Sequence, residues 1–252
     1  MVTRRADGYA LVQLLVLVAL VTFAVVLATR RLHLPIVVGS LALSTQLGPT
    51  PAAAPCLSCA ESEGMDAEAR ELLGLDDPSS VRNARRGADL LASLVIPSGV
   101  VAASVLGAWH EGSARALLED AVVIAEAAAL SANVTALSKQ SFPRSRPDGG
   151  GGSFFSSHTA RAFVLATAAG SVASLRGRES APWIWAGGLT LATGVAYLRV
   201  AGDAHWFTDV AAGAAVGSAV GIAVPWLLHR RGHGLQGRFP VTPAPGGIRI
   251  AL

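Results

Sequence analysis

A series of long apolar segments constrains the fold of this chain more than any other feature. Each run approaches the roughly 20 residues that a helix needs to cross the hydrocarbon of a bilayer, and none shows the two-residue alternation of a half-buried strand. The six runs are Tyr9–Thr29, Leu90–Ala108, Leu117–Leu137, Thr159–Leu175, Trp183–Leu198 and Val210–Leu228. The sequence therefore predicts an all-α fold, a polytopic membrane helical bundle with about six transmembrane helices.

The composition supports a membrane as the solvent for these segments. Apolar residues make up 52% of the chain before its 27 glycines are counted, and charged residues make up only 15%, against about 25% in soluble domains. The net charge is only +3. There is also no block of lysines and arginines of the kind that binds nucleic acid. We therefore expect membrane lipids, and no nucleic acid, as partners.

The alternation of apolar and polar stretches divides the chain into four parts. The first apolar run follows Arg4 and Arg5, as a signal peptide would, but it is long for one and is followed by Arg30 and Arg31. An uncleaved anchor is favoured, and a cleaved signal remains the alternative. The predicted parts are an N-terminal anchor or signal-like span (1–31), an extracytoplasmic insert (32–87), a membrane core (88–229) and a cytoplasmic tail (230–252).

The insert carries two local features. Cys56 and Cys59 form a single CxxC, which lacks the further ligands that a zinc site needs, so a local disulfide or two thiols is the simpler interpretation. The run MDAEARELLGL, residues 65–75, has the spacing of a short amphipathic helix. Neither feature indicates a role for the insert.

The arginines of the short loops set the expected orientation. With Arg4 and Arg5 in the cytoplasm, six crossings also place Arg115, Arg176 and Arg178 inside, as the positive-inside rule requires. The loops that follow the third and fifth spans then face outward. We expect an integral protein of the bacterial inner membrane with its active site facing the periplasm or the outside.

The first polar cluster of interest directly follows the third span. In KQSFPRSRP, Lys139 and Arg146 lie seven positions apart, with Arg144 between them. A tetrahedral phosphate is held by several converging cations, because arginine offers a planar fork and lysine a compact point charge. The alternative is that these side chains merely extend to the membrane interface. Their predicted outward location argues against that alternative.

The second cluster, SFFSSHT, directly precedes the fourth span. A helix that starts here would direct its free N–H groups and the positive end of its dipole at an anion. Ser156 could cap that helix or donate to a phosphate oxygen, and the N–H of Ser157 could donate as well. His158 would then lie beside the bound group. A plain helix cap with an interfacial histidine is the competing interpretation.

The third cluster, LRVAGDAHWFTD, lies between the fifth and sixth spans. Arg199 is a further candidate for phosphate binding, and His205 and Asp209 lie four positions apart, on one face of a helix. A carboxylate beside one imidazole nitrogen fixes the tautomer and leaves the other nitrogen free to attack phosphorus. Half of a metal site is the alternative, although the cationic surroundings would repel a divalent ion.

Together, the three clusters resemble the motifs of the type-2 phosphatidic acid phosphatase superfamily, K-x6-R-P, P-S-G-H and S-R-x5-H-x3-D. The first motif is complete, and the other two differ at Phe155, Ser157 and Leu198. Ser157 in place of glycine keeps its N–H, whereas Leu198 in place of serine removes a hydroxyl donor. The order, the spacing and the positions relative to the spans agree with the family from about Leu90 to Leu228.

The resemblance implies a role for each matching residue. Lys139, Arg146 and Arg199 would bind the phosphate together with Ser156 and the Ser157 N–H. The nucleophile would be His205, held by Asp209, and His158 would protonate the leaving group and then activate water. No metal or other cofactor is implied.

The implied activity is hydrolysis of a lipid phosphate or diphosphate through a phosphohistidine. The family's substrates include phosphatidic acid, phosphatidylglycerol phosphate, undecaprenyl diphosphate and a lipid A phosphate, and the motifs do not choose among them because they contact only the phosphate. The alternatives are a non-enzymatic membrane transport or binding protein that recognises phosphate, and a vanadium-dependent haloperoxidase. The sequence does not indicate an oligomeric state.

Overall fold

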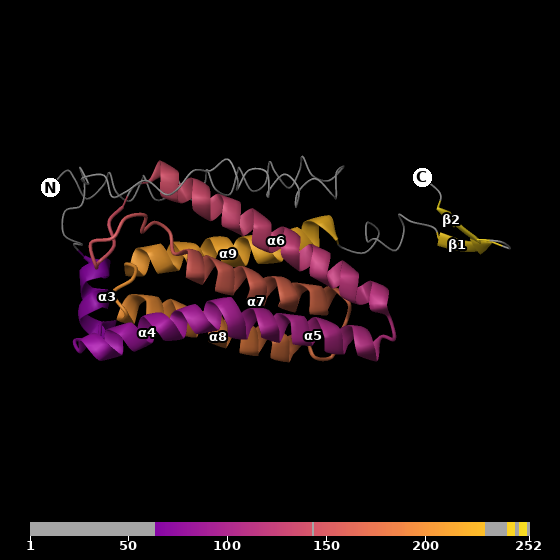
Figure 1. Ribbon diagram of the computed structural model, residues 1–252, viewed down its shortest axis with the longest axis horizontal. Helices are drawn as coiled ribbons and strands as arrows, with labels where there is room; N and C mark the ends of the chain where they lie inside the picture. Colours follow the sequence, from indigo (N-terminus) through magenta and orange to yellow (C-terminus); the bar gives the residue numbers. More distant parts are fainter. Residues whose placement is uncertain (1–63, 143, 230–240, 245–246, 251–252) are drawn as a thin grey trace.

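The computed structural model describes residues 64–142, 144–229, 241–244 and 247–250 (Figure 1). The first predicted span and the Cys56/Cys59 pair lie outside these ranges. The helices in the described part are α3 (Met65–Leu73), α4 (Pro78–Leu90), the π-helix η1 (Leu91–Val95), α5 (Ile96–His110), α6 (Ala114–Ser141), α7 (Ser157–Leu175), α8 (Ala181–Ala201) and α9 (Phe207–Leu228).

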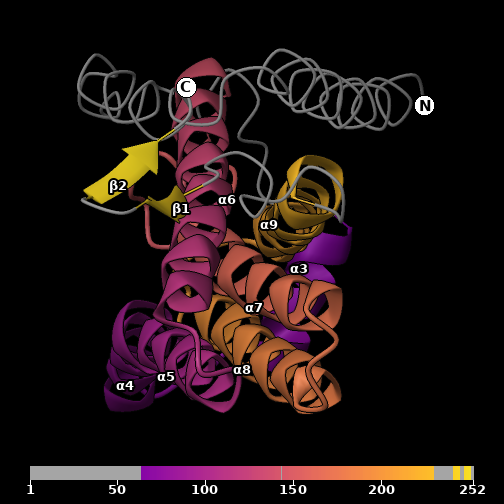
Figure 2. The same ribbon diagram turned by 90° about the vertical axis from the view of Figure 1, so that its right-hand side faces the viewer.

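The long helices lie side by side, with α6 inclined to the others, and α3 lies across one end of the bundle (Figures 1 and 2). Helices α4, η1 and α5 form one continuous helical segment of 33 residues. The π turn lies directly before Pro97, whose nitrogen has no hydrogen to donate to the preceding turn. The segment begins well before the apolar run at Leu90, and its first turns are polar.

Within the described residues, four helices are long and apolar enough to cross a membrane: 78–110, α6, α8 and α9. The prediction of a helical membrane bundle is therefore confirmed, although the count of about six spans is only approximate. Helix α7, which we also expected to span, is not among the four. His158 and Arg161, together with several serine and threonine residues, lower its mean hydropathy. The small residues also suit its central position, where 12 of its 19 residues are buried.

Helix α7 packs most closely against α9, because α9 presents a row of glycines at every fourth position. A Cβ atom added to Gly217 would lie 2.4 Å from the carbonyl oxygen of Ala160, and one added to Gly213 would lie 2.8 Å from that of Ser156. Such contacts are accessible only to glycine, which allows helix backbones to approach one another in lipid. This packing holds the start of α7 against the start of α9.

Two apolar clusters flank α7. One consists mainly of residues from α6, α7 and α9, and the other joins α7 to η1, α5 and α8. Consecutive helices from α6 to α9 run in alternating directions, so the C-terminal ends of α6 and α8 lie beside the N-terminal ends of α7 and α9. The three motif clusters therefore meet at the end of the bundle where α3 lies.

The insert and the tail each contain regular structure. Helix α3 lies within the run for which a short helix was expected. In the tail, the strands β1 (Val241–Ala244) and β2 (Gly247–Ile250) pair in an antiparallel hairpin, which the sequence analysis did not predict.

Candidate active site

The centre of the site is the imidazole of His205, which lies between α8 and α9 and is almost fully buried. Its Nδ1 atom faces the carboxylate of Asp209 at 3.7 Å and the hydroxyl of Ser153 at 3.5 Å. Its Nε2 atom is buried and has no hydrogen-bond partner. The structure thus brings together the predicted His205 and Asp209 pair and leaves the second ring nitrogen available.

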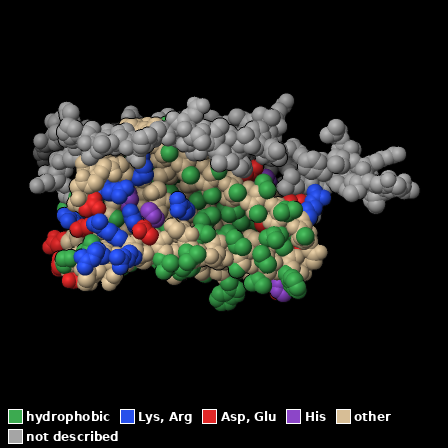
Figure 3. Space-filling view, viewed as in Figure 1, with side chains coloured by type: hydrophobic (Ala, Val, Ile, Leu, Met, Phe, Trp, Pro, Cys, Tyr) green, Lys and Arg blue, Asp and Glu red, His purple; other side chains and the backbone are tan. Residues whose placement is uncertain are grey.

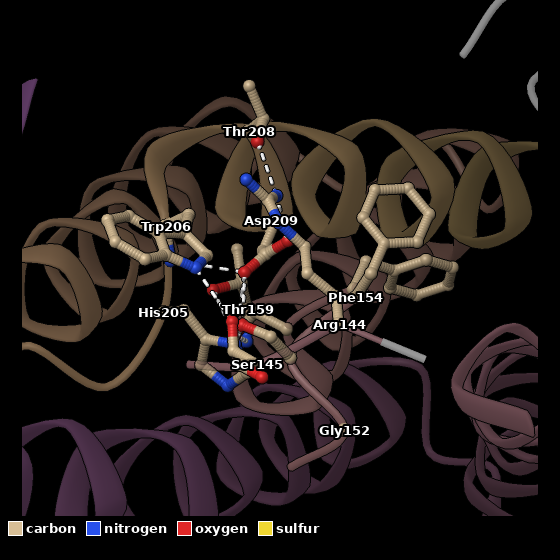
Figure 4. Close-up of polar contacts among 12 residues, drawn as sticks. Arg144, Ser145, Gly152, Phe154, Thr159, His205, Trp206, Thr208 and Asp209 are labelled. Carbon is tan, nitrogen blue, oxygen red and sulfur yellow. Dashed lines mark hydrogen bonds and ion pairs between the residues drawn. The ribbon is translucent and has the colours of Figure 1, made fainter. Parts of the chain in front are cut away.

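Asp209 is held by several donors besides the histidine. It is fully buried in the first turn of α9, where its Oδ2 accepts hydrogen bonds from the Ser153 hydroxyl and from the backbone N–H of Trp206, 3.1 Å away. Its Oδ1 accepts from Arg144 Nη1 at 2.6 Å. Figure 4 shows the Arg144 guanidinium between Thr208 and this carboxylate. These donors stabilise the charged carboxylate at a depth where an unpaired charge would be costly.

Burial also determines the charge of the His205 ring. Desolvation, reinforced by the positive charges of Arg199 and Lys139, lowers the pKa of His205 to about 4, although Asp209 opposes the shift. At neutral pH the ring is therefore uncharged, as a nucleophile must be.

Three predicted phosphate-binding cations surround the two histidines. Lys139, near the end of α6, donates to the carbonyl oxygen of Gly152 at 2.5 Å. The Nε atoms of Arg146 and Arg199 are buried and have no hydrogen-bond partner. The charges of these two arginines act on His158, and those of Lys139 and Arg199 act on His205. The cations therefore converge on the two rings with unused donors, an arrangement suited to binding an anion.

His158 lies in the first turn of α7 and contacts a carboxylate from another helix. Its Nε2 atom is 3.2 Å from Oδ1 of Asp89 on α4, and the same oxygen accepts a hydrogen bond from Arg199 Nη1 at 3.1 Å. The His158 Nδ1 is buried without a partner. The pKa of His158 is lowered to about 4, mainly because the ring is buried and secondly because the positive charge of Arg199 lies nearby.

The start of α7 is a capped helix N-terminus. Ser156 is fully buried, and its hydroxyl oxygen accepts from the backbone N–H of Thr159 at 3.4 Å and from the Thr159 hydroxyl at 3.0 Å. Its backbone N–H donates to the carbonyl oxygen of Asp209 at 3.1 Å. Ser157 is the first residue of the helix. Of the two roles considered for the Ser156 side chain, the structure shows the cap.

Sequence reasoning missed four residues that contact this site: Asp66, Asp89, Arg144 in its role as a partner of Asp209, and Ser153. Asp66 and Asp89 precede all three motifs, so no spacing indicated them. Arg144 was recognised only as a cation among others, and Ser153 only as the beginning of the second cluster. For Arg144 and Ser153, the signal in the sequence was a polar residue that lies beside a motif but has no role in it.

These features define a class: a helical integral membrane protein with two histidines and several cations gathered at one end of the bundle. Residues 120–233 match the model of the PAP2 superfamily. This segment contains the three motif clusters, and its match confirms the predicted resemblance to that family. It contains all eight predicted site residues, whose individual roles remain predictions.

One curated relative extends the comparison. The chain is 34% identical over 125 residues to a lipid A 1-phosphatase of Porphyromonas gingivalis. The aligned region covers 49% of this chain but only 27% of that relative. No solved structure matches the chain.

Proposed function

We propose that this protein is a membrane phosphatase that hydrolyses a lipid phosphate monoester or diphosphate through phospho-His205, without a metal. One observation carries the proposal: the buried Nε2 of His205 has no partner, while its Nδ1 faces Asp209 and cations surround the ring. A carboxylate behind one nitrogen makes the other a better nucleophile and stabilises the positive charge that forms on the ring.

In the first step, His205 Nε2 attacks phosphorus and the bond from phosphorus to the leaving oxygen breaks. His158 donates a proton to that oxygen. Lys139, Arg146 and Arg199 stabilise the charge on the remaining phosphate oxygens. In the second step, His158 accepts a proton from water, the water oxygen attacks phosphorus, and the P–N bond breaks to release phosphate and restore His205.

The acid role requires that His158 be protonated when substrate is bound. Without ligand its pKa is about 4, because of burial and the nearby arginines. A bound phosphate would raise that pKa, since its negative charge favours the imidazolium and offsets the charges of the arginines. The proton would thus be taken up with the substrate.

The position of the site supports a lipid substrate. Charged side chains gather at the end of the bundle that contains α3 and α4, next to a broad apolar surface (Figure 3). A lipid could place its phosphate in the site while its chains remain in the membrane. The similarity to a lipid A 1-phosphatase makes a lipid A phosphate the first substrate to test, followed by phosphatidic acid, phosphatidylglycerol phosphate and undecaprenyl diphosphate. We infer that the site faces the outer side of the bacterial inner membrane, as the loop arginines favour.

The decisive experiment measures phosphate release by purified protein from these four lipids in the presence of EDTA, with vanadate as inhibitor. Quenching a reaction with ³²P-labelled substrate in alkaline denaturing detergent should trap a phosphoenzyme that is stable in alkali and labile in acid. His205→Ala should form none. Phosphate release without a trapped intermediate in a rapid-quench series would refute the covalent step. If lipid bound intact and no phosphate were released, a binding protein would be favoured. If the vanadate-bound protein oxidised halide, a haloperoxidase would be favoured.

A second substrate can separate the two roles of His158. An aryl phosphate has a good leaving group that needs little help from an acid. His158→Ala should therefore still form the phosphoenzyme from aryl phosphate but hydrolyse it slowly, so that the intermediate accumulates. Equal slowing of both steps would contradict the assignment of His158 as the residue that activates water.

A further inference from the structure

Helix α3 is attached to the bundle in an unusual way for a helix of a folded protein. Its one buried residue is the carboxylate-bearing Asp66, whereas the side chains of Met65 and Leu72 are 65% and 82% exposed. Burial of apolar side chains therefore does not explain where α3 lies. Its polar contacts must determine its position.

The contacts of Asp66 lead directly to the site. Its Oδ2 accepts hydrogen bonds from Arg144 Nη2 at 2.6 Å and from the Thr208 hydroxyl at 2.8 Å, and its Oδ1 accepts from the Thr208 backbone N–H at 2.8 Å. Thr208 N–H is one of the free donors at the start of α9, so the carboxylate also favours the positive end of that helix. Asp66 thus fixes both the first turn of α9 and the Arg144 side chain.

Arg144 is shared between two carboxylates. Its Nη1 donates to Asp209 at 2.6 Å, its Nη2 donates to Asp66, and its guanidinium lies 5.7 Å from the centre of the Trp206 ring. One positive charge therefore faces two negative charges. If Asp66 were neutral, Arg144 alone would balance Asp209, and less negative charge would act on His205.

A second attachment holds the other end of α3 to the loop that carries His205. Arg70 makes two hydrogen bonds to the carboxylate of Asp203, at 2.8 and 2.9 Å, and the backbone N–H of Leu75 donates to the carbonyl oxygen of Ala201 at 3.3 Å. The backbone of Asp203 has a φ of 51°, in the left-handed region that residues other than glycine rarely adopt. The bidentate pair holds the loop at that strained residue.

We propose that Asp66 is a positioning residue for the reaction and that α3 fixes the catalytic pair from outside the matched family segment. Asp66 acts through Arg144 and Thr208, which hold Asp209 and the start of α9, so that the His205 ring keeps its angle and its negative partner. The inference rests on the proposed function for its kinetic readout. The inference gives the insert a role in positioning the catalytic pair, through a residue that lies outside the three motif clusters.

Asp66→Asn tests the inference, with Glu68→Gln as the matched control. The control removes the same charge from the same helix at an exposed position. We expect Asp66→Asn to lower kcat by about ten- to a hundredfold, as small displacements of reacting groups do. KM should stay within about twofold, because the phosphate-binding cations are untouched. Active sites are counted by vanadate binding, so that misfolded protein does not lower kcat. An unchanged kcat per vanadate site, or an equal loss in Glu68→Gln, would overturn the proposal.

A double variant tests whether Asp66 acts through Arg144. If the two side chains form one unit, Asp66→Asn should lower kcat little further in an Arg144→Gln background, because interacting residues are not additive. Fully additive losses would overturn the indirect role. Asp66→Glu, which restores the charge, should recover part of the lost kcat. If kcat did not recover in Asp66→Glu and the losses in the double variant were additive, the positioning role would be refuted and Asp66 would be a purely structural residue.

One measurement does not depend on activity and therefore separates this inference from the proposed function. Hydrogen exchange of the full-length protein reports directly on residues 203–209. Asp66→Asn should raise exchange there at least about tenfold, whereas Glu68→Gln should not. If the wild type released no phosphate but this difference appeared, the proposed function would fail and the positioning contact would stand. Equal exchange in wild type and Asp66→Asn would overturn the contact even in an active enzyme.

Discussion

Both ends of the bundle gather arginines, but the two groups differ in their partners. At the end where α5 meets α6, Arg176 donates to Asp120 at 2.5 Å and to Glu119 at 3.1 Å. Arg178 lies 2.7 Å from both Asp120 and Glu111. Each of these arginines thus has at least two carboxylates within ion-pair distance.

At the opposite end the cations outnumber their carboxylate partners. Arg199 pairs with Asp89, which is half exposed, and Arg146 has no ion pair among the residues that the structure describes. Lys139 contacts a carbonyl oxygen. Buried charge is costly unless it is paired. The comparison indicates that the first group holds helices together, whereas the second has the unpaired donors that the proposed phosphate site requires.

The largest difference between the two ends should appear in their histidines. His205→Ala should abolish turnover, because no other buried imidazole has a carboxylate behind it and a free Nε2 among the residues described at this site. His110→Ala changes an exposed histidine at the opposite end and should retain wild-type kcat. Phosphate release per folded molecule checks both. Near-normal release by His205→Ala would refute the proposed nucleophile.

Arginine substitutions test the comparison directly. Arg146→Ala and Arg199→Ala should each lower kcat/KM by about 10²–10³, the usual effect of removing one donor to a developing anion. Arg178→Ala should leave kcat/KM nearly unchanged but destabilise the fold by about 1–3 kcal/mol, since the buried carboxylate of Asp120 loses an ion-pair partner 2.7 Å away. Kinetics and thermal unfolding in detergent measure both quantities. The reverse pattern would mean that the two ends have been assigned wrongly.

The buried histidine should also make stability depend on pH. The pKa of His205 is about 4 in the folded state and about 6.5 when unfolded. The unfolded state therefore binds more protons between these values, and stability falls as the pH drops through 6.5 toward 4. The loss from pH 7 to pH 5 is about 2 kcal/mol for this group. His205→Asn should reduce the pH dependence of the unfolding midpoint, whereas His110→Asn should not.

The smallest effect is expected at Asp89, whose carboxylate contacts both Arg199 and His158. Asp89→Asn removes a competitor for Arg199, so vanadate should bind more tightly. Arg199 is largely buried, but Asp89 is about half exposed, so the pair is discounted to about 0.2–1 kcal/mol, the contribution of solvent-exposed pairs, which corresponds to roughly 1.4- to fivefold. A vanadate inhibition constant that is unchanged or weaker in Asp89→Asn would show that Asp89 does not occupy the anion position. Asp76→Asn, an exposed change outside the site, serves as the control.

The sequence predicted most of the helices and the composition of the site. Apolar runs of spanning length gave α6, α8 and α9 within a few residues, because membrane helices are read from local composition. The run at Thr159–Leu175 also matches the extent of α7, but that helix is not among the four apolar enough to span, because His158, Arg161 and several hydroxyl residues lower its hydropathy. The sequence placed the start of the second predicted span at Leu90, whereas the helix begins at Pro78, since polar turns that project beyond the membrane leave no hydropathy signal.

By itself, the sequence determined a membrane bundle and a set of candidate phosphate-binding residues at fixed spacings, since both depend on residues close together in the chain. Only the tertiary structure decided which charges are paired and which are free. Arg199 meets Asp89 across 110 positions and Arg144 meets Asp66 across 78. Such partners depend on which helix faces pack together, and the close approach of α7 and α9 at their glycines governs that packing.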